Sequence, residues 1–72
     1  MTKQDLINYG VAYMSTYFDF TEMDSVTSDM IQASVWQTVN ELEASGDSGP
    51  YSKMVIDLTD ELDREIDYWV FA

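Results

Sequence analysis

Six apolar residues in the last third of the chain limit its fold more than any other feature. They follow one another at intervals of four, three, four, four and three residues: Tyr51, Val55, Leu58, Leu62, Ile66 and Trp69. Because these intervals place side chains on one face of a helix, this apolar seam predicts an amphipathic helix over about residues 50–70. The β-branched residues Val55 and Ile56 also suit a short strand, but the periodicity continues unbroken beyond them and favours the helix.

The first quarter of the chain carries a similar pattern and predicts a helix over residues 3–18. Thr2 and Asp5 lie at its start with the spacing of a capping box, in which each side chain bonds the backbone amide of the other residue. The Asp5 carboxylate also lies at the positive end of the helix dipole. The residues at three- and four-residue spacing are Leu6, Gly10, Tyr13, Met14 and Tyr17, with Ile7, Val11 and Phe18 beside them.

A middle helix is predicted over about residues 27–45. Ser25, Thr27 and Ser28 can each supply the capping oxygen at its start, and the sequence does not choose between them. Gly46 suits the left-handed position just past its end. Its apolar line is Ile31, Val35, Val39 and Leu42.

Short connections join the three predicted helices, so the sequence indicates an all-α fold. Residues 19–24 break the first pattern, and Phe20 or Met23 is a candidate to pin this connection to the core. Residues 45–50 hold two of the three glycines and the only proline, and Pro50 suits the first turn of the last helix. We therefore expect the whole chain of 72 residues to form one small up-down-up three-helix bundle.

The chain is strongly acidic: 14 Asp and Glu residues stand against 3 Lys and Arg, and the net charge is −11. Hydrophobic residues make up 46% of it, which is enough to form a core, unlike the composition of an acidic disordered tail. With no His and no Cys, it lacks the usual base at neutral pH, thiolate nucleophiles and the commonest transition-metal ligands. A chain this short also has no room for a deep cleft. We expect no enzyme activity, no metal site and no cofactor.

The charge also limits the class of partner. Nucleic acids and anionic lipids are polyanions that favour clustered Lys and Arg, so neither is expected to bind this chain directly. No apolar stretch approaches the ~18 residues of a membrane span, and no signal-peptide core follows Met1. We therefore expect a soluble cytoplasmic protein whose partner is basic.

Negative side chains gather on the face of the last predicted helix that lies opposite the apolar seam. Only Arg64 interrupts them, and no basic residue lies between Lys3 and Lys53. We call the following five residues the acidic row: Asp57, Asp60, Glu61, Asp63 and Asp67. The candidate partner-binding carboxylates in the preceding segment are Glu41, Glu43 and Asp47.

Two interpretations of the acidic row are open. A charged helix face is commonly only a solvated face that keeps a protein soluble. Solvated faces, however, usually mix both signs of charge. Carboxylates about one helical turn apart, about 5.4 Å, instead imitate a line of phosphates. This second interpretation predicts a basic nucleic-acid-binding host protein as the partner.

In size, in charge and in its acidic row, the chain resembles as a class the small acidic inhibitors that phages and conjugative elements encode. The class includes antirestriction proteins of the Ocr and ArdA type, acidic anti-CRISPR proteins and uracil-DNA glycosylase inhibitors. The resemblance implies a DNA mimic that inhibits a host DNA-processing enzyme or defence complex and performs no chemistry of its own. The alternative is an acidic protein-interaction module, such as an antitoxin or an assembly factor, whose charge serves solubility.

The aromatic residues offer further candidate contacts. Tyr9, Tyr13 and Tyr17 share one face of the first predicted helix. We expect core and boundary packing for them, because aromatic stripes at helical spacing usually bury against neighbours; the alternative is a partly exposed contact strip. Trp36 and Ile56 lie off the apolar lines of their helices, so they are candidates for exposed anchors in partner binding or for a homodimer contact.

Two weaker patterns point to other functions. Asp24 and Ser25, followed by a valine, resemble the D-S-L motif of acyl carrier proteins, in which the serine carries phosphopantetheine. The preceding glycine and the long loop of such carriers are missing, and helix capping explains both residues more simply. Residues 19–29 contain four acidic residues but lack the alternating ligands, the central glycine and the terminal glutamate of a calcium-binding EF-hand.

Overall fold

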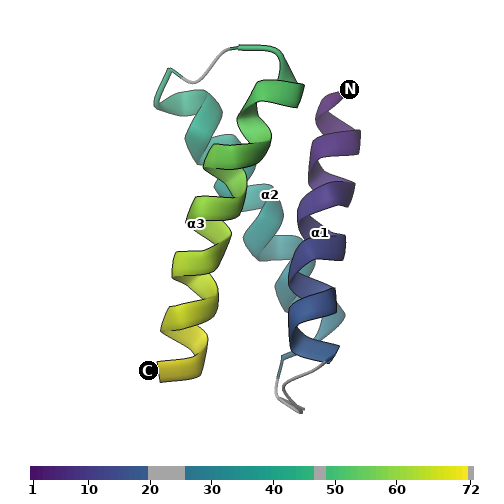
Figure 1. Ribbon diagram of the computed structural model, residues 1–72, viewed down its shortest axis with the longest axis vertical. Coiled ribbons are helices and arrows are strands. Elements are labelled where there is room, and N and C mark those ends of the chain that lie inside the picture. The colour runs from purple at the N-terminus through teal and green to yellow at the C-terminus, as the bar shows by residue number, and fades with distance from the viewer. Residues whose placement is uncertain (20–25, 47–48, 72) are drawn as a thin grey trace.

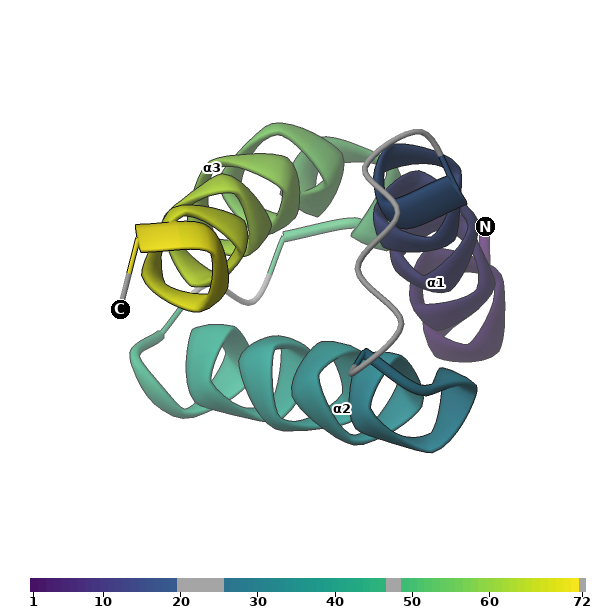
Figure 2. The ribbon, with the colours of Figure 1, turned by 90° about the horizontal axis from the view of Figure 1, so that it is seen from below.

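The computed structural model describes residues 1–19, 26–46 and 49–71, and no strand occurs within these ranges. The helices are α1 (Lys3–Asp19), α2 (Ser28–Ala44) and α3 (Tyr51–Phe71). Figure 1 shows α1 and α3 running in the same direction while α2 returns between their ends, and Figure 2 shows the three helices around one centre. The predicted all-α three-helix bundle is confirmed, and every helix end lies within one residue of its predicted position.

Local hydrogen bonds begin and end the helices where the sequence indicates. The Thr2 amide donates to Asp5 Oδ2 at 2.9 Å and the Asp5 amide donates to Thr2 Oγ1 at 3.1 Å, which confirms the capping box of α1. Of the three candidates for the start of α2, Thr27 is the cap, because its Oγ1 accepts from the Met30 amide at 3.2 Å. Gly46 follows α2 at φ +95°, in the left-handed region that favours glycine.

Pro50 ends the second connection. α3 begins at Tyr51, so Pro50 lies just before the first helical residue, and its carbonyl accepts the Lys53 amide at 2.8 Å. Pro50 therefore immediately precedes α3, and its carbonyl accepts a hydrogen bond from the first turn of the helix. Phe20 and Met23, the candidates to pin the first connection, lie outside the described residues.

One apolar core fills the space between the helices. The middle of the predicted seam, Leu58, Leu62 and Ile66, is buried, and its other members pack at the edge of the core. No polar or charged side chain is buried among the described residues. Burying a Val, Leu, Ile, Phe or Met side chain stabilises a fold by about 1.5–3 kcal/mol, so this core is the main source of stability. Its members are Leu6, Ile7, Met14, Phe18, Ile31, Val35, Val39, Met54, Leu58, Leu62 and Ile66.

Gly10 lies where α1 packs closely against both other helices. A methyl group at this position would lie 2.8 Å from Val35 Cγ1 on α2 and 3.2 Å from Leu58 Cδ2 on α3. Val35 is β-branched and buried, so it has little freedom to move away. The missing side chain of Gly10 therefore sets how closely α1 approaches its neighbours.

Substitution of Gly10 tests this packing. Alanine is a better helix former than glycine by about 1 kcal/mol, but overpacking a core costs about 1–3 kcal/mol. We expect Gly10→Ala to lower the free energy of unfolding by about 1 kcal/mol in urea denaturation. In a Val35→Ala background the same change should be neutral or stabilising, because Val35 Cγ1 is gone. If Gly10→Ala alone raises the free energy of unfolding, α1 can move slightly away from α2 and α3 without loss of stability.

Candidate protein-binding surface

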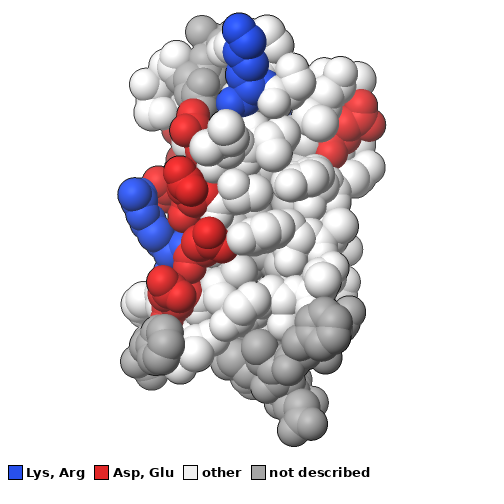
Figure 3. All heavy atoms as spheres, viewed as in Figure 1, with Lys and Arg blue, Asp and Glu red and all other residues white. Residues whose placement is uncertain are grey.

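The acidic row lies on the solvent side of α3, opposite the buried seam. Its four aspartates are exposed and Glu61 is half-buried. Arg64 is the only basic residue within α3 beyond its first turn, and its Nη1 lies 2.5 Å from Glu61 Oε1. Figure 3 shows acidic side chains gathered along α3, with basic side chains beside and above them, while the face between α3 and α1 is largely uncharged. The side chains of the acidic row are therefore accessible at the surface of the bundle.

The charge density of this row is close to that of one DNA strand. Asp57 and Asp67 are ten residues apart, so about 15 Å of helix axis carries five carboxylates. That is about one carboxylate per 3–4 Å, and one strand of B-DNA carries about one phosphate per 3.4 Å. Arg64 pairs with one of the five carboxylates, Glu61, so the four aspartates are the uncompensated members of the row. Carboxylates three or four residues apart also repel one another by about 0.2–0.5 kcal/mol per pair. The carboxylates of the row therefore follow one another about as closely as phosphates on a DNA strand, and their mutual repulsion lowers the stability of α3.

Glu43 does not share the environment of the acidic row. Lys3 Nζ lies 2.7 Å from Glu43 Oε1, and the Tyr51 hydroxyl donates to Glu43 Oε2 at 3.3 Å. The hydrogen bond from Lys3 holds the pKa of Glu43 below its usual value, although burial acts in the opposite direction. Glu43 therefore joins all three helices, and Lys3 compensates its charge at the half-buried edge of the bundle. Glu41 is exposed, and Asp47 lies outside the described residues.

The two predicted apolar anchors are both exposed, Trp36 by 44% and Ile56 by 72%. Lys3 Nζ lies 5.6 Å from the centroid of the Trp36 ring and donates to Asn40 Oδ1 at 2.9 Å. Trp36 is thus partly engaged in the contact between α1 and α2. Ile56 precedes Asp60 by one helical turn and so lies on the acidic side of α3. The part of both residues in binding stays a prediction.

The tyrosines of α1 lie at the edge of the core. Tyr9 is 44% exposed and Tyr17 is 40% exposed, so these two residues lie at the boundary of the core and not within it. Tyr13 is half-buried and packs against the core. The buried line of α1 passes through Leu6 and Met14, and it leaves the tyrosines along its rim.

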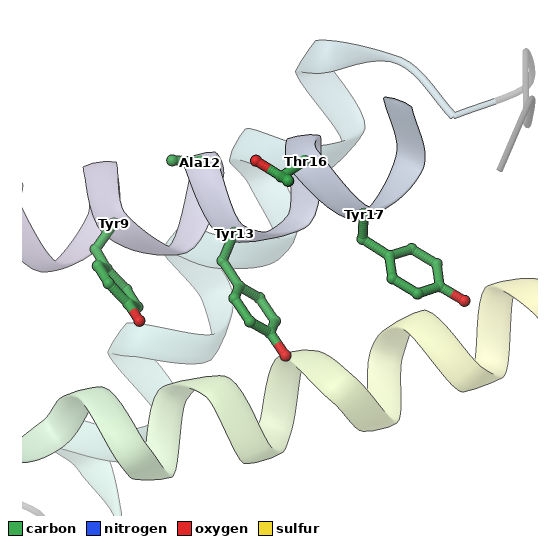
Figure 4. Close-up of a pocket in the computed structure, with 5 residues that line it drawn as sticks. All are labelled: Tyr9, Ala12, Tyr13, Thr16 and Tyr17. Atoms are coloured by element: carbon green, nitrogen blue, oxygen red, sulfur yellow. The ribbon is translucent and has the colours of Figure 1, made fainter. Parts of the chain in front are cut away.

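The same tyrosines line an open hollow of about 420 Å³. We call it the tyrosine hollow, and its lining residues are Tyr9, Ala12, Tyr13, Thr16 and Tyr17. Figure 4 shows the three tyrosine side chains directed from α1 toward α3. The Tyr13 hydroxyl donates to Asp63 Oδ1 at 2.5 Å, so the hollow and the acidic row meet at this bond.

The contact between Tyr13 and Asp63 changes the chemistry of the phenol. The hydrogen bond to Asp63 raises the pKa of Tyr13 to about 12, and burial and the negative charge of Asp60 act in the same direction. The sequence did not indicate this pair, because 50 residues separate its members. One signal in the sequence could have suggested that both residues lie near a helix contact. Tyr13 directly precedes Met14 and Asp63 directly follows Leu62, and both neighbours are buried, so each residue of the pair lies at the boundary of a packed face.

Comparison of the chain with protein families, curated proteins and solved structures found no match. In the part of the chain that the structure describes, no three acidic side chains gather closely enough to hold a metal ion. No helix there is long and apolar enough to cross a membrane. Asp24 and Ser25, which carry the resemblance to acyl carriers, and most of the 19–29 segment lie outside the described residues. A proposal for the function of this protein therefore depends on the carboxylates and the aromatic rings at its surface.

Alkaline titration checks the bond between Tyr13 and Asp63. Tyrosine in an unfolded chain releases its proton near pH 10, about the ordinary value, whereas folded Tyr13 keeps its proton up to about 12. The bond therefore stabilises the fold in full below about pH 10, and its contribution is lost as the pH rises toward 12. Tyrosinate absorbance should show a component near pH 12 that is absent in Tyr13→Phe and shifts to lower pH in Asp63→Asn.

Asp57→Asn is the matched control, because Asp57 is another exposed aspartate of α3. It should leave the late component in place. If Asp63→Asn leaves it in place as well, the hydrogen bond is not the cause of the raised pKa.

Proposed function

We propose that this protein is an acidic inhibitor that binds the nucleic-acid-binding surface of a basic host protein, with the acidic row in the place of phosphates. The observation that carries the proposal is the row itself: five carboxylates on one side of α3, at about the charge density of a DNA strand. Proteins hold nucleic acids largely by contacts to phosphates, often from Lys and Arg. A surface that accepts phosphates can accept carboxylates at similar spacing.

The fold supports the proposal because it holds the row in a fixed shape. Leu58, Leu62 and Ile66 are buried on the opposite face of α3, so the helix cannot turn the row away without exposing the core. A surface organised before binding loses less conformational entropy than a flexible acidic tail. The net charge of −11 adds a long-range attraction that speeds encounter with a positive surface.

The amount of charge also favours this function over solubility alone. A net charge of magnitude about 2–8 is enough to keep a small domain soluble, and this chain carries −11. The excess lowers stability through self-repulsion. A binding role explains why a small fold carries a charge that works against it.

The second candidate is an acidic interaction module that binds its partner through apolar contacts. Ile56, at 72% exposure, and the tyrosine hollow favour it, because exposed apolar groups mark protein contacts. The two candidates differ in one property. A mimic competes with nucleic acid for its partner, whereas a module that binds elsewhere does not.

Elution with nucleic acid separates these candidates. The protein is immobilised and exposed to a host-cell lysate at about 0.15 M salt, where the Debye length is about 8 Å. Captured proteins should be released by short duplex DNA or by RNA added at constant ionic strength, because both compete for the same surface. The purified captured protein should then lose nucleic-acid binding when this protein is added. Retention in saturating nucleic acid would contradict the mimic and favour the module.

Paired variants separate the acidic row from net charge. Asp60→Asn/Asp67→Asn neutralises two carboxylates of the row and leaves Asp63 in place. Asp29→Asn/Glu65→Gln neutralises two carboxylates outside the row and changes the net charge equally. The row variant should weaken binding to the captured protein by about fivefold or more, since exposed ion pairs contribute about 0.2–1 kcal/mol each. The control should change it less than about twofold.

Stability should move in the opposite direction from affinity in the row variant. Asp67 lies near the C-terminal end of α3, where a negative charge opposes the helix dipole, and Asp60 has acidic neighbours one turn away. Its thermal midpoint should therefore rise while binding weakens, which distinguishes a lost contact from unfolding. Equal weakening of binding by both paired variants would mean that only total charge matters.

A further inference from the structure

The tyrosine hollow is an aromatic surface that phosphate mimicry does not require. Three of its five lining residues are tyrosines, and none of the five carries a charge at neutral pH. Tyr9 and Tyr17 expose 44% and 40% of their surface at the rim of the buried face of α1. Tyrosine is enriched in the contact regions of protein interfaces, because its ring supplies a large rigid area.

The hollow adjoins the acidic row through a single bond. The Tyr13 hydroxyl donates to Asp63 Oδ1, and a carboxylate has about four acceptor sites, so Asp63 can accept further donors. Asp60 and Asp67 lie three and four residues from Asp63 on the same side of α3. An occupant of the hollow therefore meets the aromatic rings of α1 and lies beside Asp63 of α3, the member of the acidic row that is bonded to Tyr13.

A second copy of this chain does not suit such a surface. Two copies would bring together two bodies that each carry −11. The single arginine of the chain, Arg64, already pairs with Glu61 on its own helix. Charge complementarity instead calls for a cationic group from another protein, and nucleic acid is disfavoured for the same reason as a second copy.

We propose that the tyrosine hollow binds arginine side chains of the basic partner, so that the contacting segment of the partner is rich in arginine rather than lysine. The guanidinium group is planar and weakly hydrated, stacks on aromatic rings, and pairs with a carboxylate through two parallel N–H donors. The ammonium group of lysine is compact and strongly hydrated, so it gains less from the rings. This inference rests on the proposed function, because it takes a basic partner as given.

Two peptides of equal length and charge, hepta-arginine and hepta-lysine, test the inference on the full chain. Calorimetry at equal salt should show about fivefold tighter binding of hepta-arginine, in keeping with cation–π contacts at exposed sites. The double variant Tyr9→Leu/Tyr17→Leu should lose most of this preference and keep its affinity for hepta-lysine. Tyr9→Phe/Tyr17→Phe keeps the rings and should retain the preference.

The matched control is Tyr68→Leu. Tyr68 is 68% exposed and lies about 140° around α3 from Asp63, at about 100° per residue, so it faces away from the hollow. This variant should retain the arginine preference. Circular dichroism should show unchanged helicity in all variants, because Tyr9, Tyr17 and Tyr68 are exposed.

Failure of this inference differs from failure of the proposed function. Equal affinity for the two peptides, or a preference that survives in Tyr9→Leu/Tyr17→Leu, overturns the arginine site. The row variant Asp60→Asn/Asp67→Asn should lower the affinity for both peptides, with or without the tyrosine substitutions. If it binds both peptides as tightly as the unaltered chain, the acidic row does not bind cationic partners and the proposed function fails.

Discussion

Burial of the apolar seam of α3 against α1 and α2 holds together a chain whose charges repel one another. Three cations cannot pair with 14 carboxylates, and the ion pairs of Lys3 with Glu43 and of Arg64 with Glu61 lie at the surface. A buried leucine or isoleucine stabilises by about 1.5–3 kcal/mol, whereas a like-charge pair on a helix costs about 0.2–0.5 kcal/mol. The core outweighs the repulsion, and this margin allows the opposite face of α3 to carry the five carboxylates of the acidic row.

Local signals were sufficient to predict the fold. The intervals within the seam depend only on the pitch of a helix, and capping by Thr2, Thr27 and Gly46 depends on residues within one turn. These features form within a single helix and do not depend on what that helix packs against. For the same reason the acidic row could be placed opposite the seam without knowledge of the other helices. The choice of Thr27 over its two neighbours needed the structure, since all three side chains offer a suitable oxygen.

Contacts between helices could not be predicted in the same way. Tyr13 meets Asp63 across 50 residues, and Lys3 meets Glu43 across 40 residues; both depend on the axial register and rotation of packed helices. The choice between core and boundary for Tyr9 and Tyr17 also needed the structure, because spacing by four gives a shared face but not the angle of that face to the core. Gly10 was placed on the apolar line, yet only the neighbouring helices explain why it has no side chain.

The direction of the helices has an electrostatic consequence for the whole molecule. α1 and α3 are parallel and α2 is antiparallel to both (Figure 1), so one of the two parallel helix dipoles remains uncancelled. The molecule therefore has a dipole moment along its 35 Å axis in addition to its net charge. In the field of a positive surface, this contribution turns the end of the bundle at which α1 and α3 both terminate (Figure 1) toward that surface.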